Sequence, residues 1–273
     1  MRVPLTPALL ASLAAGGCAP ALREPPPIEA LGGARTPRAD AAGGTAFAGE
    51  LLRQAEESFG RRPDVAQVET ARQLFLDAAR ADETGVAGLI GAERASAWLI
   101  EHEQDGARRA ALATEGVQVC QWCQRRAPQS IACTYRLALA LGQQARERPT
   151  TASDALPRIV AFLEQVIAAE PRLDDAGPHR VLALTLLRAP GWPAGPGDPE
   201  AGLAHARQAD ALVPKHPANL LVLGEALAKT GDAVAARRAY EQAEALAKAR
   251  AAAGDPDAAE WVASSATARA ALR

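Results

Sequence analysis

Three cysteines lie close enough in the sequence to react with one another: Cys120, Cys123 and Cys133. If the chain turns near Pro128 between two antiparallel helices, Cys123 and Cys133 are each five residues from the turn and can face one another. Cys120 then lies a helical turn farther away. In an oxidising compartment, this spacing predicts a disulfide between Cys123 and Cys133. The alternative is that the cysteines act as small apolar side chains in a helix interface.

The other reactive residues do not form a recognisable metal, cofactor or catalytic motif. The stretch 120–123, Cys-Gln-Trp-Cys, lacks the following histidine of a haem-attachment motif, and no further cysteine or histidine nearby completes a zinc site. No His-Glu-x-x-His pair, Gly-x-Ser-x-Gly elbow or phosphate-binding glycine loop is present. The histidines are scattered at His102, His179, His205 and His216. We therefore expect no metal and no cofactor, and an enzyme is the least favoured class of function.

The composition favours an all-α protein without a nucleic-acid partner. Hydrophobic residues make up 48% of the 273 residues, but aromatic residues only 4%. Alanine dominates, which suits closely packed helices better than β-strands. The formal net charge is -2, with 30 Lys+Arg against 32 Asp+Glu, so no basic surface for nucleic acid is expected.

Gly, Pro and Asp divide the chain after residue 46 into helical segments that pair into hairpins. The expected pairs are 47–59 with 64–81, 86–102 with 105–127, 130–147 with 153–169, and 177–189 with 199–213, then a fifth hairpin within 214–243 and a helix over 255–272. The turns 146–153 and 189–199 are longer than the others and are predicted to be insertions. The last helix is polar and is expected to cap the stack.

The fifth hairpin resembles a tetratricopeptide repeat, whose pattern recurs about every 34 residues. The matching residues are Leu220, Leu223, Gly224, Leu227, Gly231, Ala236, Tyr240 and Ala243. Leu replaces the usual Trp and Tyr at two of these positions, and Pro128 and Pro214 stand where the closing proline of a repeat belongs. The resemblance implies an all-α, tetratricopeptide-like α/α superhelix of about five helix hairpins plus a C-terminal capping helix. It also implies binding of other molecules more than catalysis.

In the family that the chain resembles, the first helix of each hairpin lines a concave groove. The resemblance therefore implies a groove for a protein or peptide partner. In the last two hairpins, its positions are Arg180, Leu184, Leu187, Arg188, Leu221, Glu225 and Lys229. Trp192, on the proline-rich 189–199 turn, is a further candidate for partner binding, because a large rigid side chain can anchor a partner. Alternatively, Trp192 folds back over the helices as part of the core.

The N-terminal residues resemble a bacterial lipoprotein signal. Arg2 precedes an apolar run over residues 3–15, which is too short for a permanent transmembrane helix, and small residues lead to Cys18. The resemblance implies a signal peptide over 1–17, lipidation of Cys18 and anchoring in the periplasm. Because Ala19 and not Asp follows, it implies the outer membrane. An ordinary secretory signal is the alternative.

Residues 18–46 are rich in Pro and Gly and show no amphipathic period, so we expect a disordered tether with an end-to-end distance of about 30 Å. The repeat domain is then 47–273. Together these features favour a membrane-anchored periplasmic scaffold or adaptor for a protein partner.

A second family resemblance competes with the scaffold hypothesis. The Asp-x-x-Gly-Pro-x-Arg stretch 174–180, followed by Ala-Pro-Gly-Trp-Pro and Gly-Asp-Pro, is similar to the T component of tripartite ATP-independent periplasmic (TRAP) transporters. This resemblance implies a subunit that handles an apolar small molecule.

Overall fold

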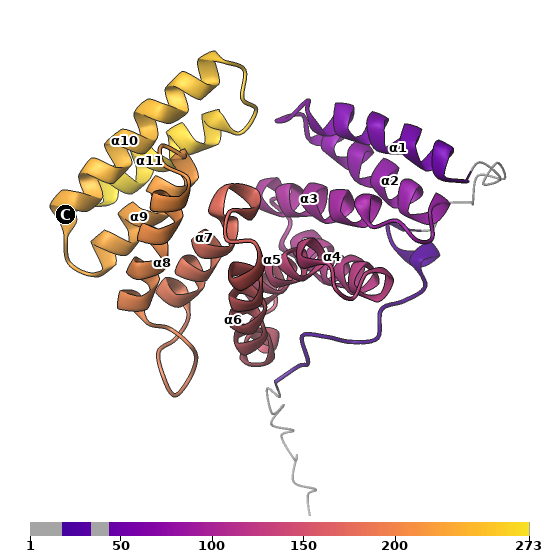
Figure 1. The fold of residues 1–273 in the computed structure, drawn as a ribbon, viewed down its shortest axis with the longest axis horizontal. Coiled ribbons are helices and arrows are strands. Elements are labelled where there is room, and N and C mark those ends of the chain that lie inside the picture. The colour runs from indigo at the N-terminus through magenta and orange to yellow at the C-terminus, as the bar shows by residue number, and fades with distance from the viewer. Residues whose placement is uncertain (1–17, 34–43, 273) are drawn as a thin grey trace, which may run out of the picture.

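The computed structural model describes residues 18–33 and 44–272, and their regular structure is helical. Within these ranges, eleven α-helices form consecutive antiparallel hairpins that coil into an α/α superhelix (Figure 1). Their bounds are α1 (Gly44–Phe59), α2 (Val65–Ala81), α3 (Ala87–His102), α4 (Gly106–Arg126), α5 (Ile131–Glu147), α6 (Ala152–Ala169), α7 (Leu173–Arg188), α8 (Pro199–Leu212), α9 (Pro217–Lys229), α10 (Ala233–Ala252) and α11 (Ala258–Ala271). The prediction of an all-α superhelix of five hairpins with a further C-terminal helix is confirmed.

The hairpin turns occur where short polar side chains can cap the following helix. At the start of five helices, an Asp or Ser side chain accepts a hydrogen bond from a backbone N–H group of the first turn. These residues are Asp64 before α2, Asp105 before α4, Ser130 before α5, Asp198 before α8 and Asp232 before α10. The same polar residues that break the amphipathic period therefore fix where the helices begin.

Glycine at the middle of α9 lets the second helix of the hairpin approach closely. A Cβ atom added at Gly224 would lie 2.4 Å from Cε1 of Tyr240, which is 5% exposed. The Leu-Gly and Ala-x3-aromatic parts of the repeat pattern therefore meet in one contact between α9 and α10. The same relation holds between α3 and α2, where a Cβ at Gly91 would lie 2.3 Å from Cδ1 of Phe75.

We expect Gly224→Ala to lower the free energy of unfolding by about 1–3 kcal/mol, because the added methyl group overpacks the contact with Tyr240. The matched control is Gly142→Ala on α5, where a Cβ meets nothing within 4 Å. There, replacing a helical glycine is expected to raise stability by about 0.5–1 kcal/mol. Urea unfolding of the two variants measures both effects. Equal effects of the two substitutions would contradict the role of Gly224.

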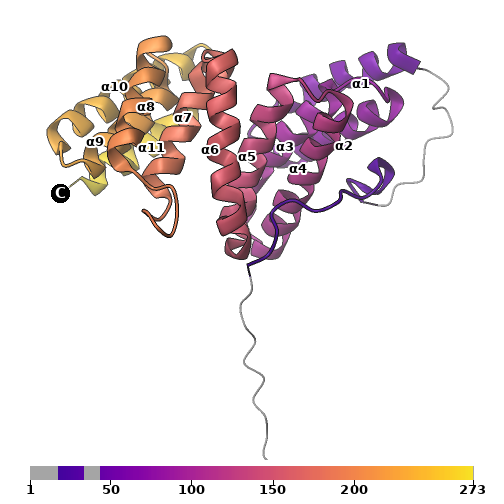
Figure 2. The same cartoon turned by 60° about the horizontal axis from the view of Figure 1, so that its bottom comes forward.

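Helix α11 covers the end of the stack, as predicted for a cap. It packs mainly on α10 and also contacts α9. Ala258 and Ser265 are buried, while Ala268 and Leu272 pack against the cluster that contains Tyr240. In Figure 2, α9, α10 and α11 form one end of the molecule, with α1 and α2 at the other.

Residues 18–33 lie against the helices, where the sequence predicts part of a disordered tether. Ala21 is 2% exposed and Leu31 is 1% exposed. The indole Nε1–H of Trp122 on α4 donates to the carbonyl oxygen of Pro26 at 2.9 Å. Arg80 donates to the carbonyl oxygen of Leu31.

The prediction of disorder is therefore wrong for residues 18–33. An extended segment needs no amphipathic period of its own when neighbouring helices supply partners for its backbone groups. The predicted signal peptide over 1–17 and residues 34–43 lie outside the described residues, and residues 44–46 belong to α1. None of the helices in the described part of the chain is both long and apolar enough to cross a membrane.

Candidate functional site

A cavity of about 630 Å³ lies on the inner side of the superhelix. Its lining comes from the first helices of four successive hairpins, α3, α5, α7 and α9, and from the α1–α2 turn and the α10–α11 region. Two tryptophans, Trp98 and Trp261, are part of the wall. Because segments from both ends of the array contribute, the cavity exists only when the superhelix is fully wound.

An ion pair between the two ends of the array closes the ring around the cavity. Arg62 in the α1–α2 turn donates to both carboxylate oxygens of Asp257 in the α10–α11 turn, at 2.9 and 3.2 Å. Arg62 also donates to the carbonyl oxygen of Phe59 and lies over that ring, 4.0 Å from its centroid. Its side chain is only 10% exposed. Figure 1 shows the two turns next to each other, although they belong to opposite ends of the array.

We expect Arg62→Gln to let the two ends of the superhelix separate, because the bidentate pair with Asp257 is the contact that joins them. Small-angle X-ray scattering should show a larger radius of gyration than for the wild type. The control is Arg53→Gln on α1, which removes an exposed ion pair with Glu50 within one helix and should leave the radius unchanged. Identical scattering curves for Arg62→Gln and the wild type would rule out this closure.

The cavity wall carries charges of both signs. Its arginines are Arg62, Arg94, Arg136, Arg180 and Arg250, and its carboxylates are Glu101, Asp174, Asp175, Asp255, Asp257 and Glu260. Partial burial raises the pKa of Glu260; the nearby His102 lowers it, and Glu101 raises it further. Glu260 at the start of α11 and Glu101 at the end of α3 both line the cavity. Such a wall suits a ligand that itself carries both charges and apolar groups.

A short left-handed turn places two of these carboxylates. Asp174, Asp175 and Ala176 have φ values of 52°, 54° and 61°, in a region that non-glycine residues rarely adopt and that costs about 1 kcal/mol or more per residue. Arg180 donates to the carbonyl oxygens of Asp174 and Asp175, both at 3.1 Å. Asn219 on α9 also donates to the Asp175 carbonyl oxygen, at 3.1 Å. The turn is therefore held from both sides.

Tyr135 on α5 fixes the carboxylate of Asp174. Its hydroxyl donates to Oδ2 of Asp174 at 2.8 Å, and a Cβ added at Gly177 would lie 2.1 Å from that hydroxyl oxygen. Only glycine fits at residue 177. Gly177 and Arg180 belong to the 174–180 motif that the sequence analysis singled out. The left-handed turn in this stretch could not be predicted, because it leaves no periodic pattern in the sequence.

A buried carboxylate, Glu93 on α3, lies behind the cavity wall. It is 1% exposed, and its Oε2 is 3.5 Å from Nη1 of Arg136. Burial raises the pKa of Glu93 to about 7, although Arg136 acts in the opposite direction.

The raised pKa of Glu93 makes stability depend on pH. The unfolded chain releases this proton near pH 4.5 and the folded chain near pH 7, so the folded state binds more protons between these values. The free energy of unfolding therefore falls as pH rises from 5 to 7, and this contribution then levels off.

Glu93→Gln lacks this titrating group and should not lose stability in this way. We therefore expect the free energy of unfolding of Glu93→Gln, minus that of the wild type, to rise by about 3 kcal/mol as the pH is raised from 5 to 8. The two proteins have the same histidines, so the pH dependence that the histidines contribute cancels in this difference. Denaturant unfolding at several pH values measures it, and parallel pH profiles would contradict the prediction.

The structure joins Cys123 at the end of α4 to Cys133 at the start of α5. Their sulfur atoms are 1.99 Å apart and their Cα atoms 5.5 Å apart, and both side chains are buried. Cys120 is a free, buried thiol, and burial raises its pKa well above the ordinary value. Cys18, the predicted lipidation site, is exposed.

Comparison with solved structures identifies the fold. The structure aligns with TTC0263, a thermophilic TPR protein of Thermus thermophilus, with a TM-score of 0.60 and 16% sequence identity; the alignment covers 81% of this chain and 98% of that one. The fold is tetratricopeptide-like. A "MamA RS-1 ArsTM double mutant" also aligns, at 18% identity over 75% of this chain and 96% of that one, with a TM-score of 0.47. No protein-family model and no curated protein matches the sequence.

The tetratricopeptide-like register places the predicted groove residues on several different surfaces. Of that set, Arg180 alone lines the cavity. Arg188 pairs with Glu225 at 2.6 Å, and Lys229 donates to the carbonyl oxygen of Leu187 at 2.6 Å. Arg188, Glu225 and Lys229 therefore form polar contacts that join α7 to α9.

The predicted groove leucines pack within the repeat. Leu187 is 3% exposed, because Gly202 lets α8 approach until an added Cβ would lie 2.9 Å from Cγ of Leu187. The assignment of Leu187 to a binding groove is therefore wrong. Leu184 and Leu221 are half-buried and pack against the core clusters of the last two hairpins.

Trp192 is 89% exposed on the α7–α8 loop, so the alternative that it packs in the core is wrong. The loop is hydrogen-bonded, with Gly197 N–H donating to the Pro190 carbonyl oxygen at 2.8 Å and Asp198 N–H to that of Leu186 at 2.9 Å. Trp192 is not part of the cavity wall. The protein therefore has two separate candidate surfaces, the inner cavity and the exposed α7–α8 loop.

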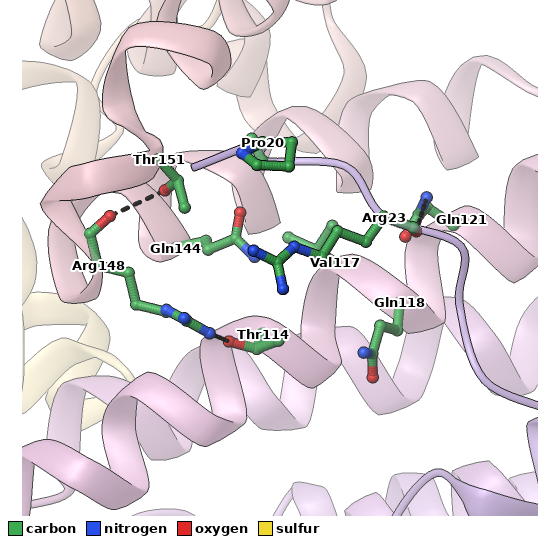
Figure 3. A pocket seen from close by; sticks show the side chains of 10 residues that line it. Pro20, Arg23, Thr114, Val117, Gln118, Gln121, Gln144, Arg148 and Thr151 are labelled. Carbon is green, nitrogen blue, oxygen red and sulfur yellow. Dashed lines mark hydrogen bonds between the residues drawn. The ribbon is translucent and has the colours of Figure 1, made fainter. Parts of the chain in front are cut away.

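A second, smaller pocket of about 120 Å³ lies beneath the N-terminal segment (Figure 3). Pro20 and Arg23 cover it, Thr114 and Gln118 come from α4, and Gln144 from α5. Figure 3 shows Arg23 extending toward Gln144, and Arg148 donating to Thr114 at 3.2 Å. The pocket is the seam where the segment docks and is too small for a drug-sized ligand.

Two histidines that are far apart in the sequence meet between α7 and α8. Nδ1 of His179 and Nδ1 of His205 are 3.0 Å apart, and burial lowers the pKa of both. Among the described residues, no group of three or more His, Cys, Asp or Glu side chains is arranged to hold a metal ion.

Proposed function

We propose that this protein is a membrane-anchored scaffold or adaptor of the bacterial cell envelope that binds a protein or peptide partner in its central cavity. The observation that carries the proposal is the cavity itself. It has a volume of about 630 Å³, opens inside a tetratricopeptide-like ring, and is lined by charges of both signs together with Trp98 and Trp261. Aromatic and arginine side chains are enriched where proteins bind one another.

The location in the envelope has two supports. The first is the resemblance of residues 1–18 to a lipoprotein signal, with the exposed Cys18 as the lipidated residue. The second is the Cys123–Cys133 disulfide, since such bonds persist in oxidising compartments such as the periplasm. The residue after Cys18 favours the outer membrane as the membrane of attachment.

Handling of an apolar solute, as in a TRAP transporter T component, is less well supported. The Asp174–Arg180 stretch that carries that resemblance forms the left-handed turn, whose carboxylates face the cavity. A wall of arginines and carboxylates is costly to desolvate for an apolar ligand.

The test is to fill the cavity. Ala97 on α3 and Ala218 on α9 line it, whereas Ala111 on α4 and Ala251 on α10 are exposed and lie outside it. The double variant Ala97→Trp/Ala218→Trp should lose a co-purifying polypeptide that the wild type and the control double variant Ala111→Trp/Ala251→Trp retain. Quantitative mass spectrometry of material purified from cell envelopes gives the readout, and a partner set that is the same for all three proteins would refute the proposal.

A further inference from the structure

The chain enters the folded body at the α5–α6 turn. The N–H of Ala19 donates to the carbonyl oxygen of Thr150 at 2.9 Å, and the N–H of Ala21 donates to Oδ2 of Asp154 at 2.9 Å. Ala21 is 2% exposed, whereas Cys18 is exposed. A lipid attached at Cys18 is therefore held within a few residues of this turn and not at the end of a long tether.

The α7–α8 loop lies at the same edge of the molecule. In both Figure 1 and Figure 2 the loop that follows α7 projects downward beside the lower end of α6, where the described chain begins. Trp192 on this loop is 89% exposed, more than the other large exposed hydrophobic side chains of the described residues, Val234 at 65% and Val65 at 50%.

The loop presents Trp192 on an ordered backbone. Besides the bonds of Gly197 and Asp198, the N–H of Ala194 donates to the carbonyl oxygen of Gly191 at 3.0 Å. Because the loop is already ordered, little further entropy is lost when its tryptophan is buried.

The charge of this edge suits a lipid surface. Residues 189–197 carry no charged side chain, and the α5–α6 turn contributes the exposed Arg148. Two acidic groups near this edge are occupied, since Asp154 accepts from Ala21 and Arg158 and Asp198 caps α8, while Glu200 in the first turn of α8 is exposed. Tryptophan is favoured at the level of lipid headgroups, and a basic residue is attracted to anionic lipids.

We propose that the edge formed by the α5–α6 turn and the α7–α8 loop faces the membrane, and that Trp192 inserts into the lipid interface as a second point of attachment beside Cys18. The bilayer is the partner of this surface because Cys18, the proposed site of lipidation, lies at this edge. More than one acyl chain at Cys18 would already hold the protein at the membrane, but at one point only, so the contact of Trp192 fixes which face of the protein meets the lipid. The inference rests on the proposed membrane attachment at Cys18, but adds an orientation that attachment alone does not set.

The test uses full-length lipidated protein, extracted from membranes and reconstituted in phosphatidylethanolamine–phosphatidylglycerol vesicles with brominated acyl chains. Bromine quenches only tryptophans that enter the lipid. The wild type should lose a fraction of its fluorescence, and Trp192→Phe should lose none. The matched control Trp261→Phe, which removes a tryptophan from the cavity, should keep the quenching of the wild type.

Vesicle flotation in the same samples separates the two proposals. Protein that floats, with equal quenching in the wild type and Trp192→Phe, would keep the anchor and overturn the orientation. Protein that does not float would overturn both. A spectral change of Trp192 that depends on protein concentration without vesicles would assign the loop to a second copy of the chain and overturn the membrane assignment.

Discussion

Replacing Arg180 by alanine is expected to lower the free energy of unfolding by about 1–3 kcal/mol, because its side chain holds the left-handed turn against α9. The guanidinium of Arg180 donates to Oδ1 of Asn219 at 2.8 Å and to two carbonyl oxygens of the turn. Asn219 is fully buried. Without Arg180, the buried Oδ1 of Asn219 loses its donor, which costs about 1–3 kcal/mol, whereas the carbonyl oxygens of the exposed Asp174 and Asp175 can bind water instead.

The matched control for Arg180 is Arg188→Ala, two helical turns away on α7. Arg188 is exposed and pairs with Glu225, so its loss should cost no more than about 1 kcal/mol. Arg180→Lys keeps the charge but cannot donate in the same fork, and we expect it to recover only part of the loss. Urea unfolding measures all three variants. A loss for Arg180→Ala as small as that for Arg188→Ala would show that the turn does not depend on this side chain.

Reduction of the Cys123–Cys133 disulfide is expected to lower the free energy of unfolding by about 3 kcal/mol, because the bond closes a short loop between α4 and α5 and restricts the unfolded chain. The double variant Cys123→Ala/Cys133→Ala should be destabilised similarly and should no longer respond to a reducing agent. Cys120→Ala, which removes a buried free thiol one turn away, should keep the response.

Peptide mass mapping without reduction should recover residues 123 and 133 in one linked species. If the wild type unfolds at the same denaturant concentration with and without reductant, the bond is absent or makes no contribution to stability.

The sequence is sufficient to predict the helices because the repeat pattern is local. The Leu-Gly and Ala-x3-aromatic spacings of α9 and α10 describe a contact between Gly224 and Tyr240 inside one hairpin, and capping residues such as Asp232 fix where helices begin. The predicted bounds of the other helices therefore agree with the structure to within a few residues, whereas the fifth hairpin, predicted within 214–243, continues to Ala252. The long turn predicted at 189–199 is present between α7 and α8, but the insertion predicted at 146–153 is wrong, because only residues 148–151 separate α5 from α6.

The cavity could not be predicted in the same way, because it depends on the winding of the whole array. Arg62 and Asp257 are 195 residues apart and meet only when the superhelix closes. Carrying the groove positions of a repeat family over to α7 and α9 found Arg180, but it could not find Trp98 and Trp261, which face the same space from α3 and α11.

The docked N-terminal segment was missed for another reason. Its backbone binds side chains of distant helices, such as Trp122, so its own sequence resembles a free coil.

The most direct test of the central claim is photo-crosslinking from inside the cavity. A photoreactive p-benzoylphenylalanine in place of Trp261, which lines the cavity, is compared in living cells with the same group in place of Val234, which is exposed at the start of α10. After irradiation, we predict a covalent adduct with a distinct polypeptide from position 261 and none from position 234. No adduct at position 261, or the same adducts from both positions, would contradict a partner-binding cavity.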